Sequence, residues 1–230
     1  MNDQIDQEKT RSASMSVTSI AIGPKAQAAP YRRLTIGTNR GDVSCRYYPS
    51  ENATVGVVLA GGMGGAWNSP GGGRLFPDIS AELSDRGIAS VRIEYRHPTN
   101  LVESILDVLA GTIFLTLTGV HSQGLVGHSL GAAAVAQAAT FSNTVKTVVL
   151  LSTQSFGAAE AALTLGGRAS MLLMHGTEDD VLPSTCSEFV YALAKEPKEI
   201  ILLPGGDHML MSVEEEARER TVAWLSRELV

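Results

Sequence analysis

The amino-acid sequence predicts an α/β protein, a single domain with a mostly parallel central sheet and helices on both faces. Short, continuously apolar segments alternate with longer segments of helical periodicity, which is typical of a parallel sheet buried on both sides. The chain has 230 residues, of which 44% are hydrophobic and 18% are charged. That length fits one domain with a sizeable core and excludes disorder along the whole chain.

The first 28 residues are polar, rich in Ser, Gln and Ala, and show no sustained period. We therefore expect 1–28 to be a flexible tail and 29–230 to form the domain. A signal peptide is not expected, because Asp3, Asp6 and Glu8 stand where a basic region would be. No apolar run reaches the ~18 residues of a transmembrane helix, so we expect no membrane insertion and a cytoplasmic location.

The domain begins with a predicted β-hairpin. Tyr31–Thr38 and Asp42–Tyr48 have strand character and are joined by Asn39-Arg40-Gly41, a turn with glycine where the turn favours it. Val55–Ala60 follows as a short apolar strand that ends at a glycine-rich stretch. The hairpin therefore precedes the parallel part of the sheet.

Strands and helices alternate through the remainder of the chain. Further strands are expected at Ile88–Tyr95, Gly124–Gly127, Thr147–Leu151, Met171–Met174 and Glu199–Leu203. Helices are expected at Phe76–Asp85, Asn100–Leu117, Leu130–Phe141 and Ser184–Ala194. A last helix should begin at Ser212, where Glu215 three residues on completes a capping box.

Glycine is the unusual component of this composition. The chain has 23 glycines, and seven of them lie between positions 61 and 73. Glycine occurs where the backbone needs a positive φ or must come close to another group. Because ligands bind at the carboxyl ends of parallel strands, we expect the glycine-containing loops that follow the strands to contain the site residues.

One glycine-flanked serine lies between a predicted strand and a predicted helix. The sequence Gly127-His128-Ser129-Leu130-Gly131 has the pattern G-x-S-x-G, in which a tight strand-to-helix turn exposes the serine hydroxyl. The helix that follows directs its positive end at developing negative charge. Ser129 is therefore the candidate nucleophile, and the alternative is a turn whose serine merely caps the helix.

A serine nucleophile needs a histidine base and a carboxylate that orients it. Of the five histidines, His208 follows the last strand, in a loop that can reach back over the sheet. Asp179 is the preferred acid, and its neighbours Glu178 and Asp180 are the alternatives. Asp207 adjoins the histidine and is better explained as a turn former. The chain order Ser129, Asp179, His208 is the one expected for this arrangement of strands.

Backbone N–H groups are expected to stabilise the oxyanion that forms when the serine attacks a carbonyl group. One donor should be Leu130, which follows the nucleophile. The other should lie in the glycine-rich loop after Val55–Ala60, where Met63 is the first choice and Gly62 the second. The same loop lacks the third glycine of a dinucleotide-binding motif and the lysine of a Walker A motif.

With these motifs in place, the chain resembles the α/β-hydrolase superfamily, and within it small dienelactone-hydrolase-like or carboxylesterase-like members. The resemblance extends from Tyr31 to Val230 and depends on the motifs GGMGG, GHSLG, HGTEDDVLP and GGDH. It implies an α/β-hydrolase fold and a serine esterase. Two positions depart from the pattern. Gly61 stands where the superfamily often has histidine, and Ser129 stands where dienelactone hydrolases proper have cysteine, so dienelactone itself is not implied.

The resemblance also predicts a minimal or absent cap. Only about seventeen residues separate the strand that ends near Ser152 from the one that starts near Ser170, whereas many relatives insert a helical cap there. An open site favours small acyl substrates. The candidate pocket residues follow strands on the same side, with ordinary loop packing as the alternative: Trp67, Arg96, Thr153 and Gln154.

The function predicted is hydrolysis of carboxylic esters or thioesters of small acyl substrates through an acyl-enzyme. No metal or cofactor is expected, and Cys45 and Cys186 are too few for a zinc site or a disulfide framework. The net charge of −6 gives no basic surface for nucleic acid, so no nucleic-acid partner is expected, and no particular oligomeric state is predicted. Two alternatives remain open, namely an acyltransferase that uses the same triad and a non-catalytic binding module.

Overall fold

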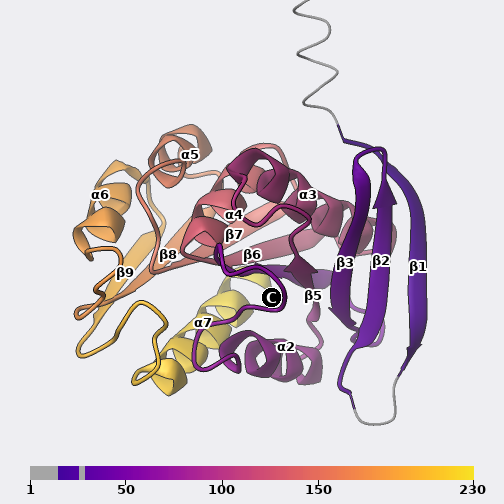
Figure 1. Cartoon of the computed structure of the whole chain (residues 1–230), viewed down its shortest axis with the longest axis horizontal. Helices are drawn as coiled ribbons and strands as arrows, with labels where there is room; N and C mark the ends of the chain where they lie inside the picture. The colour runs from indigo at the N-terminus through magenta and orange to yellow at the C-terminus, as the bar shows by residue number, and fades with distance from the viewer. Residues whose placement is uncertain (1–14, 26–28) are drawn as a thin grey trace, which may run out of the picture.

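The computed structural model describes residues 15–25 and 29–230, which form a single nine-stranded sheet flanked by helices (Figure 1). The strand order is β1-β2-β3-β5-β4-β6-β7-β8-β9. The strands are β1 Val17–Lys25, β2 Arg32–Thr38, β3 Gly41–Tyr48, β4 Val55–Ala60, β5 Ala89–Glu94, β6 Ser122–His128, β7 Val145–Leu151, β8 Ser170–Gly176 and β9 Lys198–Leu203. The helices are α2 Leu75–Asp85, α3 Leu101–Leu117, α4 Leu130–Thr140, α5 Ala158–Leu165, α6 Thr185–Leu193 and α7 Glu214–Leu229.

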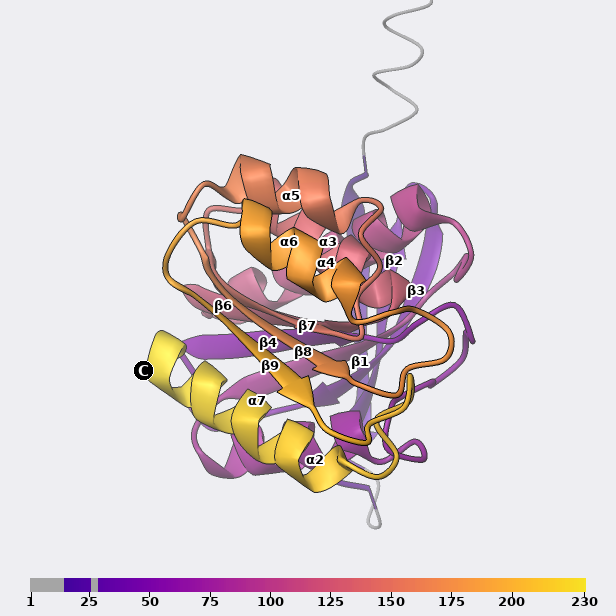
Figure 2. The ribbon, with the colours of Figure 1, turned by 90° about the vertical axis from the view of Figure 1, so that its left-hand side faces the viewer.

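The helices form two layers. Figure 2 shows α3, α4, α5 and α6 on one face of the sheet and α2 with α7 on the other. Each layer buries its own apolar cluster against the sheet, the larger one under the alanine-rich α4 and its neighbours. The predicted architecture, a mostly parallel sheet covered on both faces, is therefore confirmed.

The direction of the strands decides where a site can form. β1, β2 and β3 are antiparallel to their neighbours, whereas β5, β4, β6, β7, β8 and β9 run parallel. The loops that follow β4, β6, β7, β8 and β9 therefore leave the sheet at one edge. In parallel α/β sheets this edge is where ligands bind.

The structure corrects the expected N-terminal tail. Val17–Lys25 forms β1, an antiparallel edge strand paired with β2. Nearly all of its side chains are exposed, so its sequence shows no buried alternation, and the strand is held by backbone pairing. The tail prediction is wrong for these residues, while 1–14 and 26–28 lie outside the described residues.

Two further differences concern helices. α5 was not expected from the sequence, and the capping box predicted for the last helix is wrong. α7 begins at Glu214 after Val213, without a side-chain cap, and the Ser212 hydroxyl instead donates to the carbonyl of Gly205 at 2.7 Å. The other predicted elements agree with the structure to within two residues at each end.

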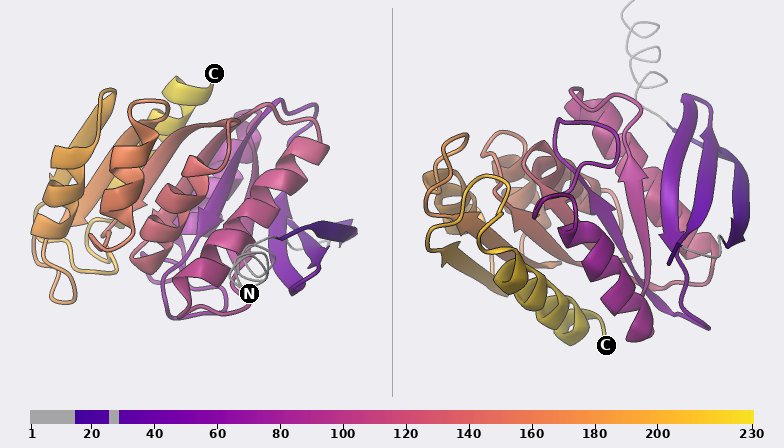
Figure 3. Two further views of the ribbon diagram at one scale, coloured as in Figure 1. Left: turned by 90° about the horizontal axis from the view of Figure 1, so that it is seen from above. Right: turned by 60° about the horizontal axis from the view of Figure 1, so that its bottom comes forward.

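The connection between β7 and β8 contains α5, which packs beside α4 and α6 in the layer over the sheet. Seen from above in Figure 3, the helices of this layer run side by side across the sheet. This connection therefore adds no cap over the edge where the loops meet, as the sequence predicts. None of the described helices combines the length and apolar character needed to cross a membrane.

Candidate active site

Ser129 lies in the turn between β6 and α4, in a backbone conformation that favours glycine. Its φ is 56° and its ψ is −122°, and such a conformation in a non-glycine residue stores strain that is typical of functional sites. Its N–H donates to the carbonyl of Leu151 at 2.9 Å, whereas its side chain caps no helical N–H group. The alternative of a capping serine is therefore wrong.

The glycines on either side of Ser129 are required by close backbone contacts. A Cβ at Gly127 would lie 2.2 Å from the carbonyl oxygen of Gly131, and a Cβ at Gly131 would lie 2.2 Å from that of Gly61. Real Cβ atoms essentially never come this close to a backbone oxygen. The turn therefore packs directly against the loop after β4, which is the predicted oxyanion loop.

The predicted acid and base meet at the same edge of the sheet. Nδ1 of His208, in the loop after β9, lies 2.8 Å from Oδ2 of Asp179, in the loop after β8. The Asp179 side chain is fully buried, and that of His208 is 12% exposed. With Nδ1 bound to the carboxylate, Nε2 is the ring nitrogen left for proton transfer.

Other donors hold the Asp179 carboxylate in place. Oδ1 accepts hydrogen bonds from the N–H groups of Val181 and Leu182 at 2.9 and 2.8 Å, and Nε2 of His175 lies 3.0 Å from Oδ2. Burial raises the pKa of Asp179, but the hydrogen bonds from Leu182, His208 and Val181 outweigh it and lower the pKa below its usual range. The carboxylate is therefore ionised at neutral pH.

The acid and base loops touch each other through glycine. A Cβ at Gly176 would lie 2.1 Å from the carbonyl oxygen of Gly206. The N–H of Glu178 donates to that same oxygen at 2.9 Å, and the N–H of Gly205 donates to the hydroxyl of Thr177 at 3.0 Å. These backbone contacts fix the two loops relative to each other.

The alternative acids are placed differently. Glu178 and Asp180 are exposed, and neither side chain has a partner among the described residues. Asp207 accepts the N–H of Met211 at 2.8 Å, as expected for a turn former. Of the four carboxylates considered, Asp179 is the one that contacts His208.

Two further histidines, His128 and His175, are buried beside the predicted acid and base, and their positions were not predicted from the sequence. Nε2 of His128 lies 2.8 Å from the backbone oxygen of His208, and the two rings are 4.9 Å apart. Burial lowers the pKa of His128 to about 4, so Nε2 carries the hydrogen of a neutral ring. His175 is buried, with Nδ1 2.7 Å from the Ser187 hydroxyl. Both histidines lie at the ends of apolar strands in the sequence, and this could have indicated buried rings with hydrogen-bond partners, because buried polar groups need partners.

The predicted oxyanion donors flank the serine. Leu130 is the first residue of α4, so its N–H is one of the helix's unpaired donors. A Cβ at Gly62 would lie 3.3 Å from the Cβ of Ser129, which places this loop against the candidate nucleophile. Met63 follows and is 57% exposed.

The four candidate pocket residues have different surroundings. The Arg96 side chain binds Asp107, Glu103 and the carbonyl of Arg40, which agrees with ordinary loop packing rather than a place in the substrate pocket. Thr153 is buried, and its hydroxyl donates to the carbonyl of Gln154. The amide of Gln154 donates to the carbonyl of Phe156. Trp67 lines a cavity on the face of β2 and β3.

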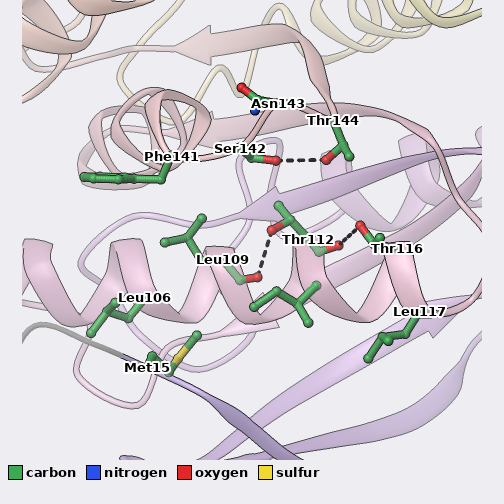
Figure 4. A pocket seen from close by; sticks show the side chains of 11 residues that line it. Met15, Leu106, Leu109, Thr112, Thr116, Leu117, Phe141, Ser142, Asn143 and Thr144 are labelled. Atoms are coloured by element: carbon green, nitrogen blue, oxygen red, sulfur yellow. Dashed lines mark hydrogen bonds between the residues drawn. The ribbon is translucent and has the colours of Figure 1, made fainter.

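A second cavity lies away from this site. It measures about 450 Å³ and is formed by α3 and the segment after α4 (Figure 4). Its lining includes Leu109, Thr112 and Phe141 but none of the residues described above as candidate nucleophile, acid or base. Within the described part of the chain, no group of three His, Cys, Asp or Glu residues could hold a metal ion.

The strand order, the turn at Ser129 and the loops after β8 and β9 define an α/β-hydrolase fold. No family model matches the chain. Dienelactone hydrolase from Anabaena variabilis is similar with a TM-score of 0.76 and 17% identity, over 87% of this chain and 98% of that one. Est1E from Butyrivibrio proteoclasticus is similar with a TM-score of 0.74 and 15% identity, over 85% and 98%.

A cold-adapted esterase from an Arctic intertidal metagenomic library is similar with a TM-score of 0.73 and 15% identity, over 93% of this chain and all of that one. At these identities the likenesses establish the fold. Sequence relatives include the proteins described as uncharacterized protein YfhR from Salmonella typhi and Escherichia coli K12, which are 54% identical over 39 residues. That match covers 17% of this chain and only 13% and 14% of those proteins.

Proposed function

We propose that the protein is a serine hydrolase that cleaves carboxylic ester or thioester bonds of small acyl substrates through an acyl-enzyme. The observation that carries this proposal is the Asp179–His208 hydrogen bond beside the strained turn of Ser129. Similarity to structures described as esterases and a dienelactone hydrolase supports a hydrolase. The connection between β7 and β8, which adds no cap, favours small substrates.

In the proposed reaction, Ser129 Oγ attacks the carbonyl carbon while Nε2 of His208 accepts the hydroxyl proton. Asp179, bound to Nδ1, fixes the ring and stabilises its positive charge. The N–H groups of Met63 and Leu130 bind the oxyanion, with Gly62 as the alternative donor. His208 then protonates the leaving alcohol or thiol, and it next activates a water molecule that releases the acid and restores the serine hydroxyl.

The experiment is labelling with a fluorophosphonate probe and turnover of p-nitrophenyl acetate. We expect Ser129→Ala to abolish labelling by the probe and to abolish the enzymatic turnover of p-nitrophenyl acetate. Ser155→Ala is the matched control, because Ser155 lies in the loop after β7 and its side chain makes no hydrogen bond among the described residues. Equal labelling of Ser129→Ala and wild type would overturn the assignment. Product analysis with added alcohols separates hydrolysis from acyl transfer.

A further inference from the structure

Three arginines form one row across the antiparallel end of the sheet. Arg33 of β2 is in register with Arg46 of β3, and Arg46 is in register with Arg92 of β5. Register partners project from the same face of a sheet, and like charges directly opposite each other destabilise it. Among the residues that the structure describes, no carboxylate forms a salt bridge with any of the three.

Arg92 is the most constrained of the three. Only 2% of the residue is exposed, and its Nη1 has no hydrogen-bond partner among the described residues. Its Nη2 donates to the carbonyl of Trp67 at 3.2 Å. Burial lowers the pKa of Arg92, a contact with Tyr48 opposes this, and the charge of Arg46 lowers the pKa further. An unpaired buried cation is costly unless an anion compensates it.

Two members of the row, Arg33 and Arg46, line a cavity of about 260 Å³ together with Trp67, Glu94 and Tyr31, among others, whereas Arg92 adjoins Arg46 without lining the cavity. The Arg46 guanidinium carbon lies 4.1 Å from the centre of the Trp67 ring and 4.8 Å from that of Tyr31. That of Arg92 lies 5.9 Å from Trp67. Among the lining residues, Arg33 and Arg46 contribute two positive charges and Glu94 one negative charge, so the cavity is cationic in a protein whose net charge is −6.

We propose that this cavity binds a small organic monoanion, a carboxylate attached to a planar apolar body. Guanidinium groups bind carboxylates through paired hydrogen bonds, and the carboxylate of Glu94 disfavours a dianion such as a phosphate. The rings of Trp67 and Tyr31, which stack on the Arg46 guanidinium, add aromatic surface to the cavity wall against which a planar apolar body can pack. The volume of about 260 Å³ is slightly below the ~300–1,000 Å³ of most ligand pockets, so the ligand must be small.

The site is separate from the proposed catalytic centre but shares a loop with it. Trp67 lies five residues after Gly62, in the loop that packs against Ser129. Binding to this cavity requires no turnover, so it can be measured whether or not Ser129 is a nucleophile. Failure of the two proposals is therefore distinguishable.

The test is isothermal titration calorimetry with benzoate and with benzamide, its neutral isostere. We expect saturable binding of benzoate by wild type and binding of benzamide at least about tenfold weaker, because benzamide lacks the charge that strengthens hydrogen bonds with guanidinium groups. Benzoate should also change the fluorescence of Trp67, and Trp67→Phe should remove that change.

Arg46→Gln and Arg33→Gln should each weaken benzoate binding about tenfold. Arg46 is half-buried, so its variant could unfold. Arg33 is exposed, so Arg33→Gln keeps the fold and provides the test in that case. Arg227→Gln is the matched control, because Arg227 stacks 4.4 Å from the other tryptophan, Trp224, and should leave binding unchanged. Absence of benzoate binding, equal binding of benzamide, or wild-type affinity in folded arginine-row variants would overturn the proposal.

Discussion

Exchanging the Asp179 carboxylate for an amide tests the proposed acid directly. In Asp179→Asn, Oδ1 must still accept the N–H groups of Val181 and Leu182, so the new NH₂ group replaces Oδ2. That group then faces Nδ1 of His208 at a site where the wild-type atoms are 2.8 Å apart. Two donors cannot share the contact, and His208 must move its hydrogen to Nε2.

The magnitude follows from this change of tautomer. A ring with hydrogen on Nε2 cannot accept the proton of Ser129, and the same exchange in a Ser-His-Asp triad lowers kcat about 10⁴-fold. That factor corresponds to about 5 kcal/mol of activation free energy. The NH₂ group also faces Nε2 of His175, which lies 3.0 Å from Oδ2 in the wild type. We therefore expect a loss of about 10³ to 10⁴ in kcat with the overall fold retained.

The assay is the pH profile of kcat for p-nitrophenyl acetate, with circular dichroism to check the fold. Asp180→Asn is the matched control, because this neighbouring carboxylate is exposed and makes no contact with His208 among the described residues. It should leave kcat within about twofold of wild type. The reasoning is refuted if Asp179→Asn retains kcat near the wild-type value, or if Asp180→Asn loses as much activity.

Three further predictions concern stability, measured by denaturant unfolding. The pKa of His128 is lowered to about 4 in the folded protein, so as the pH falls the unfolded chain takes up a proton at this histidine before the folded chain does. Wild type should therefore lose up to about 3 kcal/mol between pH ~6.5 and ~4, and His128→Gln should lose less; equal slopes would contradict this. Gly131→Ala should cost about 3 kcal/mol, because its Cβ would meet the carbonyl of Gly61; wild-type stability would refute the clash. Arg96→Met should cost about 3–5 kcal/mol, because buried Asp107 loses its positively charged partner and keeps only the hydrogen bond from the backbone N–H of residue 96; a cost below about 1 kcal/mol would exclude that role.

The parallel part of the sheet could be predicted because its strands are buried on both faces. Runs such as Val55–Ala60 are continuously apolar for this reason, and the loops after them were located from the same pattern. The pairing of Asp179 with His208 followed from loop order, since loops after parallel strands meet at one edge.

The missed features have physical causes of their own. β1 is exposed along nearly its whole length, so no hydrophobic period marks it. α5 has only eight residues between Gly157 and Gly166, too short for a clear period. The row of Arg33, Arg46 and Arg92 depends on strand register, which links residues far apart in the sequence.

Several of the chain's glycines lie where two loops of the candidate site are in direct backbone contact. The Gly131–Gly61 contact joins the serine turn to the predicted oxyanion loop, and the Gly176–Gly206 contact joins the acid loop to the base loop. His128, next to Ser129, connects the two halves through the carbonyl of His208. Because these contacts are mainly between backbones, a side chain added at Gly131 or Gly176 must displace a whole loop. Stability and activity should therefore fall together at these glycines, whereas at Asp179 activity should fall while the fold remains.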